Sequence, residues 1–293
     1  GVPAAAARHH VFYFGGMPAS AEEPALHSAL SGKADMYREK GVHLVCIDKV
    51  GMGGTALNTR FRIRHDWPVI VRRVADKLGV EKYGVFGVSN GGPYVMAVLT
   101  AENEEDRSRC TAASMVVGVS DVSASGYFSL FHPSGFFEGC FNSLPIRVSG
   151  LVTWSAIQFF SWVLFGLPDL YNKKAPHKLN HPAARDVFRK ILRDAARHQG
   201  RGASLDCQQG LSPLYARLSK DVAGSERSAE TAYRDIKVHV ALWFGKQDGT
   251  VPLKTADYLH ERLPKSTKHY VDGTHMLFGE FAETIVDDLI VNM

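Results

Sequence analysis

The stretch Tyr83-Gly84-Val85-Phe86-Gly87-Val88-Ser89-Asn90-Gly91-Gly92 decides how this chain folds. Its first six residues form an apolar run that predicts a strand, and the residues from Gly91 to about Glu102 predict a helix. The pattern G-x-S-x-G lies between them, where glycines permit a turn sharp enough to hold the serine hydroxyl above a sheet. Ser89 is therefore a candidate nucleophile. The competing interpretation is a glycine-rich turn whose serine only caps the helix.

Short apolar runs alternate with helical patterns on both sides of this stretch. Strands are predicted over 11–14, 42–47, 112–119, 238–244 and 268–271, and helices over 24–40, 66–78, 255–263 and 278–291, with Asp66 as an N-cap. Fully apolar strands that alternate with helices are typical of a mostly parallel sheet covered by helices on both faces.

The alternation stops between residues 122 and 235, where aromatic-rich helical patterns predominate. We therefore predict one α/β core, formed by residues 1–121 and 236–293, that carries a helical cap over residues 122–235. An insertion above the carboxyl edge of the sheet would cover the place where such folds bind ligands.

A serine is a weak nucleophile at neutral pH and needs a base, which must be chosen among 13 histidines. His275 follows the last predicted strand, at the edge of the sheet where Ser89 also lies, whereas helical histidines such as His27 are interpreted as surface residues or caps. Asp248 follows the preceding strand and would orient His275. The order Ser89, Asp248, His275 is the one expected for a triad on such a sheet. Asp121 is the rival acid, and a simple turn residue is the alternative for Asp248.

Four motifs of this sequence resemble those of the α/β-hydrolase superfamily, in the capped branch that includes proline iminopeptidases, esterases and epoxide hydrolases. They are Phe14-Gly15-Gly16-Met17-Pro18, Asp48-Lys49-Val50-Gly51-Met52-Gly53, the turn from Gly87 to Gly91, and Asp248 to Pro252 with Gly273-Thr274-His275. The resemblance covers nearly the whole of both core segments and is weak over the cap. It implies an α/β-hydrolase fold. Because epoxide hydrolases of this family use a carboxylate nucleophile, a serine at this position favours acyl transfer from Ser89 over epoxide hydrolysis.

The resemblance also implies an oxyanion hole formed by the backbone N–H groups of Met17 and Asn90. The sequence departs from the family at Gly15, where a histidine usually supports the loop, so the geometry of the first donor depends on what replaces that histidine. The family also has an antiparallel pair of strands before the first motif. Only residues 1–13 precede Phe14 here, and these N-terminal strands are expected to be missing.

These features predict a serine hydrolase that cleaves a carboxylic ester, or a similar acyl bond, through an acyl-enzyme intermediate. An aminopeptidase of the proline iminopeptidase type and a non-catalytic ligand-binding protein remain as alternatives. Four cap aromatics would line an apolar acyl pocket, or would simply pack the cap on the core: Trp154, Phe159, Phe160 and Trp162. They belong to an uncharged segment between Arg147 and Asp169, whose polar residues disfavour a transmembrane helix but allow an interfacial one.

Composition narrows the remaining possibilities. The formal net charge of +4 is spread along the chain, which favours a small-molecule acyl substrate over a nucleic acid as the partner. The four cysteines lack zinc-ligand spacing, and no metal or organic cofactor is expected. Free thiols and the absence of a signal-peptide pattern predict a cytoplasmic protein. The sequence does not indicate an oligomeric state.

Overall fold

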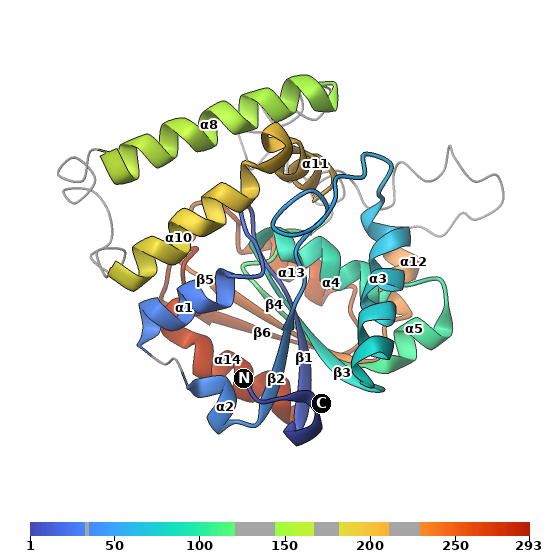
Figure 1. Cartoon of the computed structure of the whole chain (residues 1–293). Helices are drawn as coiled ribbons and strands as arrows, with labels where there is room; N and C mark the ends of the chain where they lie inside the picture. The colour runs from blue at the N-terminus through green and yellow to red at the C-terminus, as the bar shows by residue number, and fades with distance from the viewer. Residues whose placement is uncertain (33–34, 121–143, 167–181, 211–228) are drawn as a thin grey trace.

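The computed structural model describes residues 1–32, 35–120, 144–166, 182–210 and 229–293 (Figure 1). Six strands form one sheet in the order β2-β1-β3-β4-β5-β6, and every neighbouring pair is parallel. The strands are β1 (His9–Phe14), β2 (Val42–Cys46), β3 (Tyr83–Val88), β4 (Cys110–Val116), β5 (His239–Gly245) and β6 (Ser266–Val271). The predicted α/β architecture with a mostly parallel sheet is therefore confirmed.

Helices cover both faces of the sheet, which is why its central strands are apolar on both sides. One face packs on α3 (Ile63–Leu78), α4 (Gly92–Leu99), α12 (Ala229–Arg234) and α13 (Lys254–His260). The other face packs on α2 (Met36–Glu39) and α14 (Phe278–Val291). Consecutive residues of β1 show the alternation, because Phe12 lies in the first of these cores and Tyr13 in the second.

Several predicted boundaries are wrong, each for a local reason. The helix expected over 24–40 is two helices, α1 (Glu23–Ser31) and α2, because Gly32 ends α1 in a left-handed conformation with φ of 70°. Asp66 does not cap α3, which begins one turn earlier, and its carboxylate accepts the backbone N–H of Arg62 instead. The helix after the elbow ends at Leu99, and Asn103 caps a further helix, α5 (Glu104–Arg109).

The described part of residues 122–235 contains helices and no strand. These are α8 (Ile146–Gly166), α10 (Pro182–Ala195), the short 3-10 helix η4 (Arg197–Gly200), α11 (Arg201–Gly210) and α12. Figure 1 shows α8, α10 and α11 together above one end of the sheet. They share a small apolar core that includes Ile157, Leu192 and Ala203. Tyr233 of α12 instead packs in the main core, so the cap boundary at residue 235 stays a prediction.

The N-terminal residues run beside β2, the edge strand of the sheet. A 3-10 helix, η1 (Ala4–Ala6), precedes β1, and the N–H of Val2 donates to the carbonyl oxygen of Val42 over 3.0 Å. This bond occupies one of the backbone groups that an edge strand would otherwise expose. Among the described residues, the antiparallel strand pair of the family has no counterpart.

The long helix α8 is the one described helix that is long and apolar enough to cross a membrane. Only 22% of its most apolar 18-residue window is buried, so most of this window faces away from the protein. Length and composition alone do not distinguish a spanning helix from one that lies on an apolar surface.

Candidate active site

The elbow after β3 holds Ser89 in a strained conformation, with φ of 51°. Its glycines are required by close contacts. A Cβ on Gly91 would lie 2.1 Å from the carbonyl oxygen of Phe14, and a Cβ on Gly87 would lie 2.8 Å from the carbonyl oxygen of Gly91. The turn therefore packs directly against the end of β1, and Ser89 emerges where α4 begins.

Ser89, His275 and Asp248 form a continuous chain of hydrogen bonds. Ser89 Oγ lies 3.0 Å from His275 Nε2, and His275 Nδ1 lies 2.8 Å from Asp248 Oδ2. Because a carboxylate only accepts, Nδ1 carries the proton and Nε2 is left to accept the serine hydroxyl. The three residues follow β3, β6 and β5 respectively, so the parallel strands bring them to one edge of the sheet.

Within this series of hydrogen bonds, Asp248 is held more firmly than His275. The Asp248 side chain is fully buried, and its Oδ1 accepts the backbone N–H groups of Thr250 and Val251 over 2.7 and 3.0 Å. The His275 side chain is 26% exposed, which leaves its edge accessible from outside. This arrangement is suited to a histidine that exchanges a proton while its carboxylate stays charged. The rival acid, Asp121, lies outside the described residues.

The two candidate oxyanion donors come from two segments, the loop after β1 that carries Met17 and the turn after β3 that carries Asn90. A Cβ on Gly16 would lie 3.3 Å from Ser89 Cβ, so the loop that carries Met17 packs against the nucleophile. Within the described ranges, no protein acceptor meets the backbone N–H of Met17. Asn90 follows Ser89 directly, and its buried side chain donates to the carbonyl oxygen of Asp206 over 3.2 Å.

A glutamate occupies the place that Gly15 leaves. Glu23 Oε2 accepts the N–H of Gly16 and the hydroxyl of Tyr13, both over 2.9 Å. A Cβ on Gly15 would lie 2.4 Å from that same oxygen, so a larger residue there would displace the Glu23 carboxylate from its place. The loop is therefore supported by a carboxylate from α1, and the absence of the family's histidine has a structural explanation.

Burial by itself would raise the pKa of Glu23. The nearby His27 imidazole, whose Nε2 lies 3.7 Å from Glu23 Oε1, acts together with hydrogen bonds from the Gly16 N–H and the Tyr13 hydroxyl to outweigh burial and hold that pKa below its ordinary value. The same surroundings raise the pKa of Tyr13, chiefly through burial and then through the Glu23 charge. The sequence predicts His27 as a helix-surface residue or a cap, but the residue is buried and packs edge-on against Phe278.

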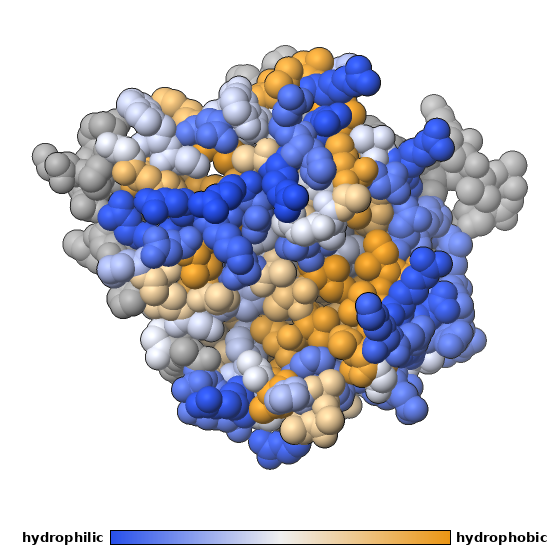
Figure 2. Space-filling model, viewed as in Figure 1, coloured by the Kyte–Doolittle hydropathy of each residue, from blue (hydrophilic) through white to orange (hydrophobic). Residues whose placement is uncertain are grey.

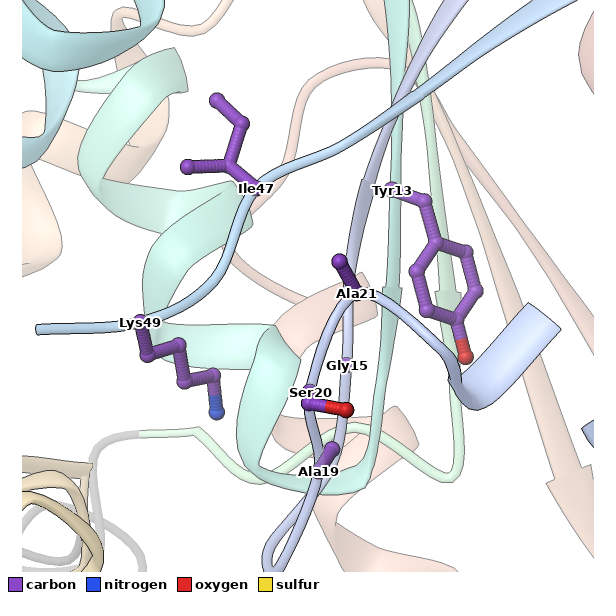
Figure 3. A pocket seen from close by; sticks show the side chains of 7 residues that line it. All are labelled: Tyr13, Gly15, Ala19, Ser20, Ala21, Ile47 and Lys49. Carbon is purple, nitrogen blue, oxygen red and sulfur yellow. The ribbon is translucent and has the colours of Figure 1, made fainter. Parts of the chain in front are cut away.

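A small pocket lies behind the loop that carries Met17 (Figure 3). The lining residues come from the end of β1, the following loop and the segment after β2: Tyr13, Gly15, Ala19, Ser20, Ala21, Ile47 and Lys49. The pocket does not reach Ser89. It separates the loop from the segment after β2, in which Asp48 accepts the N–H of Ala21 over 2.7 Å and that of Gly54 over 2.8 Å. The Asp-x-x-Gly-x-Gly motif therefore joins two loops.

The four cap aromatics lie along the exposed side of α8. Trp154, Phe159, Phe160 and Trp162 are 40%, 65%, 47% and 58% exposed. The buried residues of α8 are small or aliphatic, such as Gly150 and Ile157, and Phe160 contacts Phe188 of α10 edge-on. That the aromatics line an acyl pocket stays a prediction. The described residues contain no group of three His, Cys, Asp or Glu side chains placed to hold a metal ion.

Comparisons with solved structures agree with this architecture. The chain is similar to an esterase from Exiguobacterium antarcticum with a TM-score of 0.64 and 13% identity, covering 98% of this chain and 92% of that one. An enol-lactonase from Burkholderia xenovorans gives 0.60 and 14%, covering 97% and 90%, and the carboxylesterase CesB from Bacillus subtilis gives 0.57 and 15%, covering 96% and 83%. No protein-family model and no curated protein matches the sequence. The chain has the α/β-hydrolase fold.

Proposed function

We propose that this protein is a serine hydrolase that cleaves a carboxylic ester through an acyl-enzyme intermediate. The observation that carries the proposal is the hydrogen-bonded chain from Ser89 through His275 to a fully buried Asp248. Such a chain activates a hydroxyl that is otherwise a weak nucleophile. The names of the structural neighbours, which include esterase, carboxylesterase and enol-lactonase, support hydrolysis of an ester bond.

The proposed reaction begins when Ser89 Oγ attacks the substrate carbonyl and His275 Nε2 takes the hydroxyl proton. The N–H groups of Met17 and Asn90 stabilise the negative charge that develops on the carbonyl oxygen. His275 then protonates the departing alcohol, and the acyl group remains on Ser89. A water molecule, deprotonated by His275, attacks the acyl-enzyme and releases the acid.

An ester is favoured over a peptide with a free amino terminus, because an aminopeptidase needs an acidic group to bind the substrate amine. Asp206 approaches the elbow from α11, but its two carboxylate oxygens accept hydrogen bonds from Lys49 and Tyr94. It is also buried, with 3% exposure, so it is not free to bind an amine.

The test is a panel of p-nitrophenyl esters of increasing chain length beside a panel of aminoacyl arylamides, with Ser89→Ala as the control. We expect turnover of esters, little turnover of arylamides, and loss of both with Ser89→Ala. A fluorophosphonate probe should label Ser89 in the same preparation. A folded protein that neither turns over an ester nor reacts with the probe would instead be a non-catalytic ligand-binding protein of this fold.

The exposed side of α8 favours a second, narrower function, hydrolysis of lipid esters at a membrane surface. Val148, Leu151 and Val152 extend the line of exposed aromatics along the helix. An interfacial helix presents an apolar face of this kind to the acyl boundary of a bilayer. Figure 2 shows hydrophilic side chains over α10, the neighbouring helix.

Vesicle co-sedimentation tests this second function. The variant Phe159→Ser/Trp162→Ser should lose binding to phosphatidylcholine–phosphatidylglycerol vesicles while turnover of a short soluble ester stays within about twofold of wild type. The double change Lys77→Ser/Leu78→Ser, at the exposed end of α3, is the matched control. Equal vesicle binding by wild type and by the α8 variant would exclude a membrane-surface role for α8.

A further inference from the structure

Lys49 places a buried ammonium group beneath the proposed oxyanion hole. Its side chain is 3% exposed, and its Nζ has one acceptor for each of its three protons. These are the carbonyl oxygen of Gly16 at 3.1 Å, the carbonyl oxygen of Asn90 at 3.2 Å and Asp206 Oδ2 at 2.9 Å. Figure 3 shows the side chain extending from the segment after β2 toward the oxyanion loop.

The first of these carbonyls shares a peptide unit with a proposed oxyanion donor. The carbonyl of Gly16 and the N–H of Met17 belong to one planar trans peptide, so they point in opposite directions. An ammonium on the carbonyl side therefore fixes the direction of the Met17 N–H. It also polarises the amide, which makes the N–H a stronger donor. Glu23 holds the preceding N–H of Gly16, so the loop is anchored on both sides.

The second carbonyl fixes the other donor segment. The carbonyl of Asn90 is held by Lys49, and the peptide that carries the Asn90 N–H is held through the carbonyl of Ser89, which accepts the N–H of Val119 over 2.9 Å. One ammonium group therefore joins the loop after β1 to the turn after β3, the two segments between which the oxyanion would lie.

The charge of Lys49 is balanced from the cap. Asp206 lies on α11, and its second oxygen accepts the hydroxyl of Tyr94 over 2.7 Å. The Lys49 ammonium lies 4.5 Å from the centroid of the Tyr94 ring, which adds a cation–π contact. A charge buried this deeply is stable only when it is paired and hydrogen-bonded. The position of Lys49 therefore depends on α11.

We propose that Lys49 is a positioning residue of the oxyanion hole and that Asp206 and Tyr94 hold it in place. This inference rests on the proposed function and deepens it. It also explains how this chain can have Gly15 where the family usually has a histidine, because Lys49 and Glu23 together supply the support that the histidine usually gives the loop. Through Asp206, the arrangement of the cap helix α11 then controls the strength of the oxyanion hole.

The test removes both buried charges at once, because removing one alone leaves the other unpaired and strongly destabilises the fold. In the variant Lys49→Met/Asp206→Asn, we expect the rate of fluorophosphonate reaction at Ser89 to fall by about tenfold to a hundredfold, since a lost oxyanion donor costs at least as much. On a p-nitrophenyl ester, kcat should fall to a similar extent while KM changes by less than about threefold.

A matched control removes a different ion pair. Arg72 and Asp106 pair over 2.7 Å between α3 and α5, away from the oxyanion loop. The variant Arg72→Met/Asp106→Asn should react at the wild-type rate once both proteins are compared at equal folded fraction. An equal loss of rate in both double variants would mean that Lys49 acts only through stability, and it would overturn the proposal.

A milder variant keeps the proposal testable if the double change does not fold. Tyr94→Phe frees one oxygen of Asp206 and should lower the reaction rate by roughly twofold to tenfold without a change in KM. Tyr270→Phe is the matched control, because Tyr270 also donates to an aspartate, Asp257, over 2.6 Å.

Two outcomes separate the role of Lys49 from the proposed function. A wild-type rate for both folded variants, Tyr94→Phe and Lys49→Met/Asp206→Asn, would refute the role of Lys49 and leave the proposed function standing. A wild-type protein that Ser89-directed probes never label would refute both this role and the proposed function.

Discussion

The elbow at Ser89 and the oxyanion loop at Gly15–Pro18 meet at the same point but are held by different kinds of contact. The elbow depends mainly on glycines next to Ser89 in the sequence, since Gly87 and Gly91 permit the tight turn and the strained φ of Ser89, although Gly91 also makes room for the carbonyl oxygen of Phe14. The loop is shaped by distant residues. Lys49 lies 33 positions from Gly16 and 157 positions from Asp206. A local motif is therefore enough to identify Ser89 as the proposed nucleophile, whereas the proposed oxyanion loop depends on three separate parts of the chain.

The largest effect is expected on the triad side of this comparison. Asp248→Asn should lower kcat by about ten-thousandfold, because the amide favours the wrong tautomer of His275 while the geometry is kept. Steady-state kinetics on a p-nitrophenyl ester measures it. Asp121→Asn serves as the comparison, and near-normal activity of Asp248→Asn with loss of activity in Asp121→Asn would reverse the assignment of the acid.

A smaller effect is expected when the oxyanion loop is displaced. Gly15→Ala places a Cβ 2.4 Å from Glu23 Oε2 and 2.8 Å from Ala19 Cβ, so either the loop or the Glu23 carboxylate that holds it must move. Loss of one oxyanion donor costs about a hundredfold to a thousandfold in kcat, and that range is the upper limit of the expected fall. Gly279→Ala in α14 is the matched control, because no atom lies within 4 Å of its added Cβ. Equal activity of the two variants would show that the Glu23 contact does not position the loop.

The smallest effect concerns the charge of Glu23. Because the folded-state pKa of Glu23 lies below its ordinary value of 4.5, the carboxylate stabilises the fold above that pH, and this stabilisation is lost as the pH falls through the folded-state pKa. Glu23→Gln should lower the free energy of unfolding by about 1.5 to 3 kcal/mol at pH 7, the range for hydrogen bonds to a charged group. Urea unfolding at pH 7 and pH 4 should show the difference from wild type shrinking at the lower pH. A difference that grows on acidification would contradict the assigned direction of the pKa.

Sequence patterns predicted the core of the fold because its strands are short apolar runs with glycine turns. The strand from Tyr83 to Val88 and the helix from Phe278 to Val291 end where they were predicted to end. Predictions were wrong where a single residue ended an element, as at Gly32, which divides one expected helix into two. They also missed Lys49, which stood inside a motif of the resemblance without any sign that its side chain was buried.

By itself, the sequence determined the parallel α/β sheet, the position of Ser89 on a sharp turn and the order of Asp248 and His275 along the chain. Each of these depends on residues that are neighbours in sequence or on strands whose ends must meet at one edge of a parallel sheet. Only the tertiary structure decided how the Gly15 loop is supported, because Glu23, Lys49 and Asp206 come from three separate elements. A buried charge acquires its role from the partners that folding brings to it, and those partners cannot be identified from local pattern.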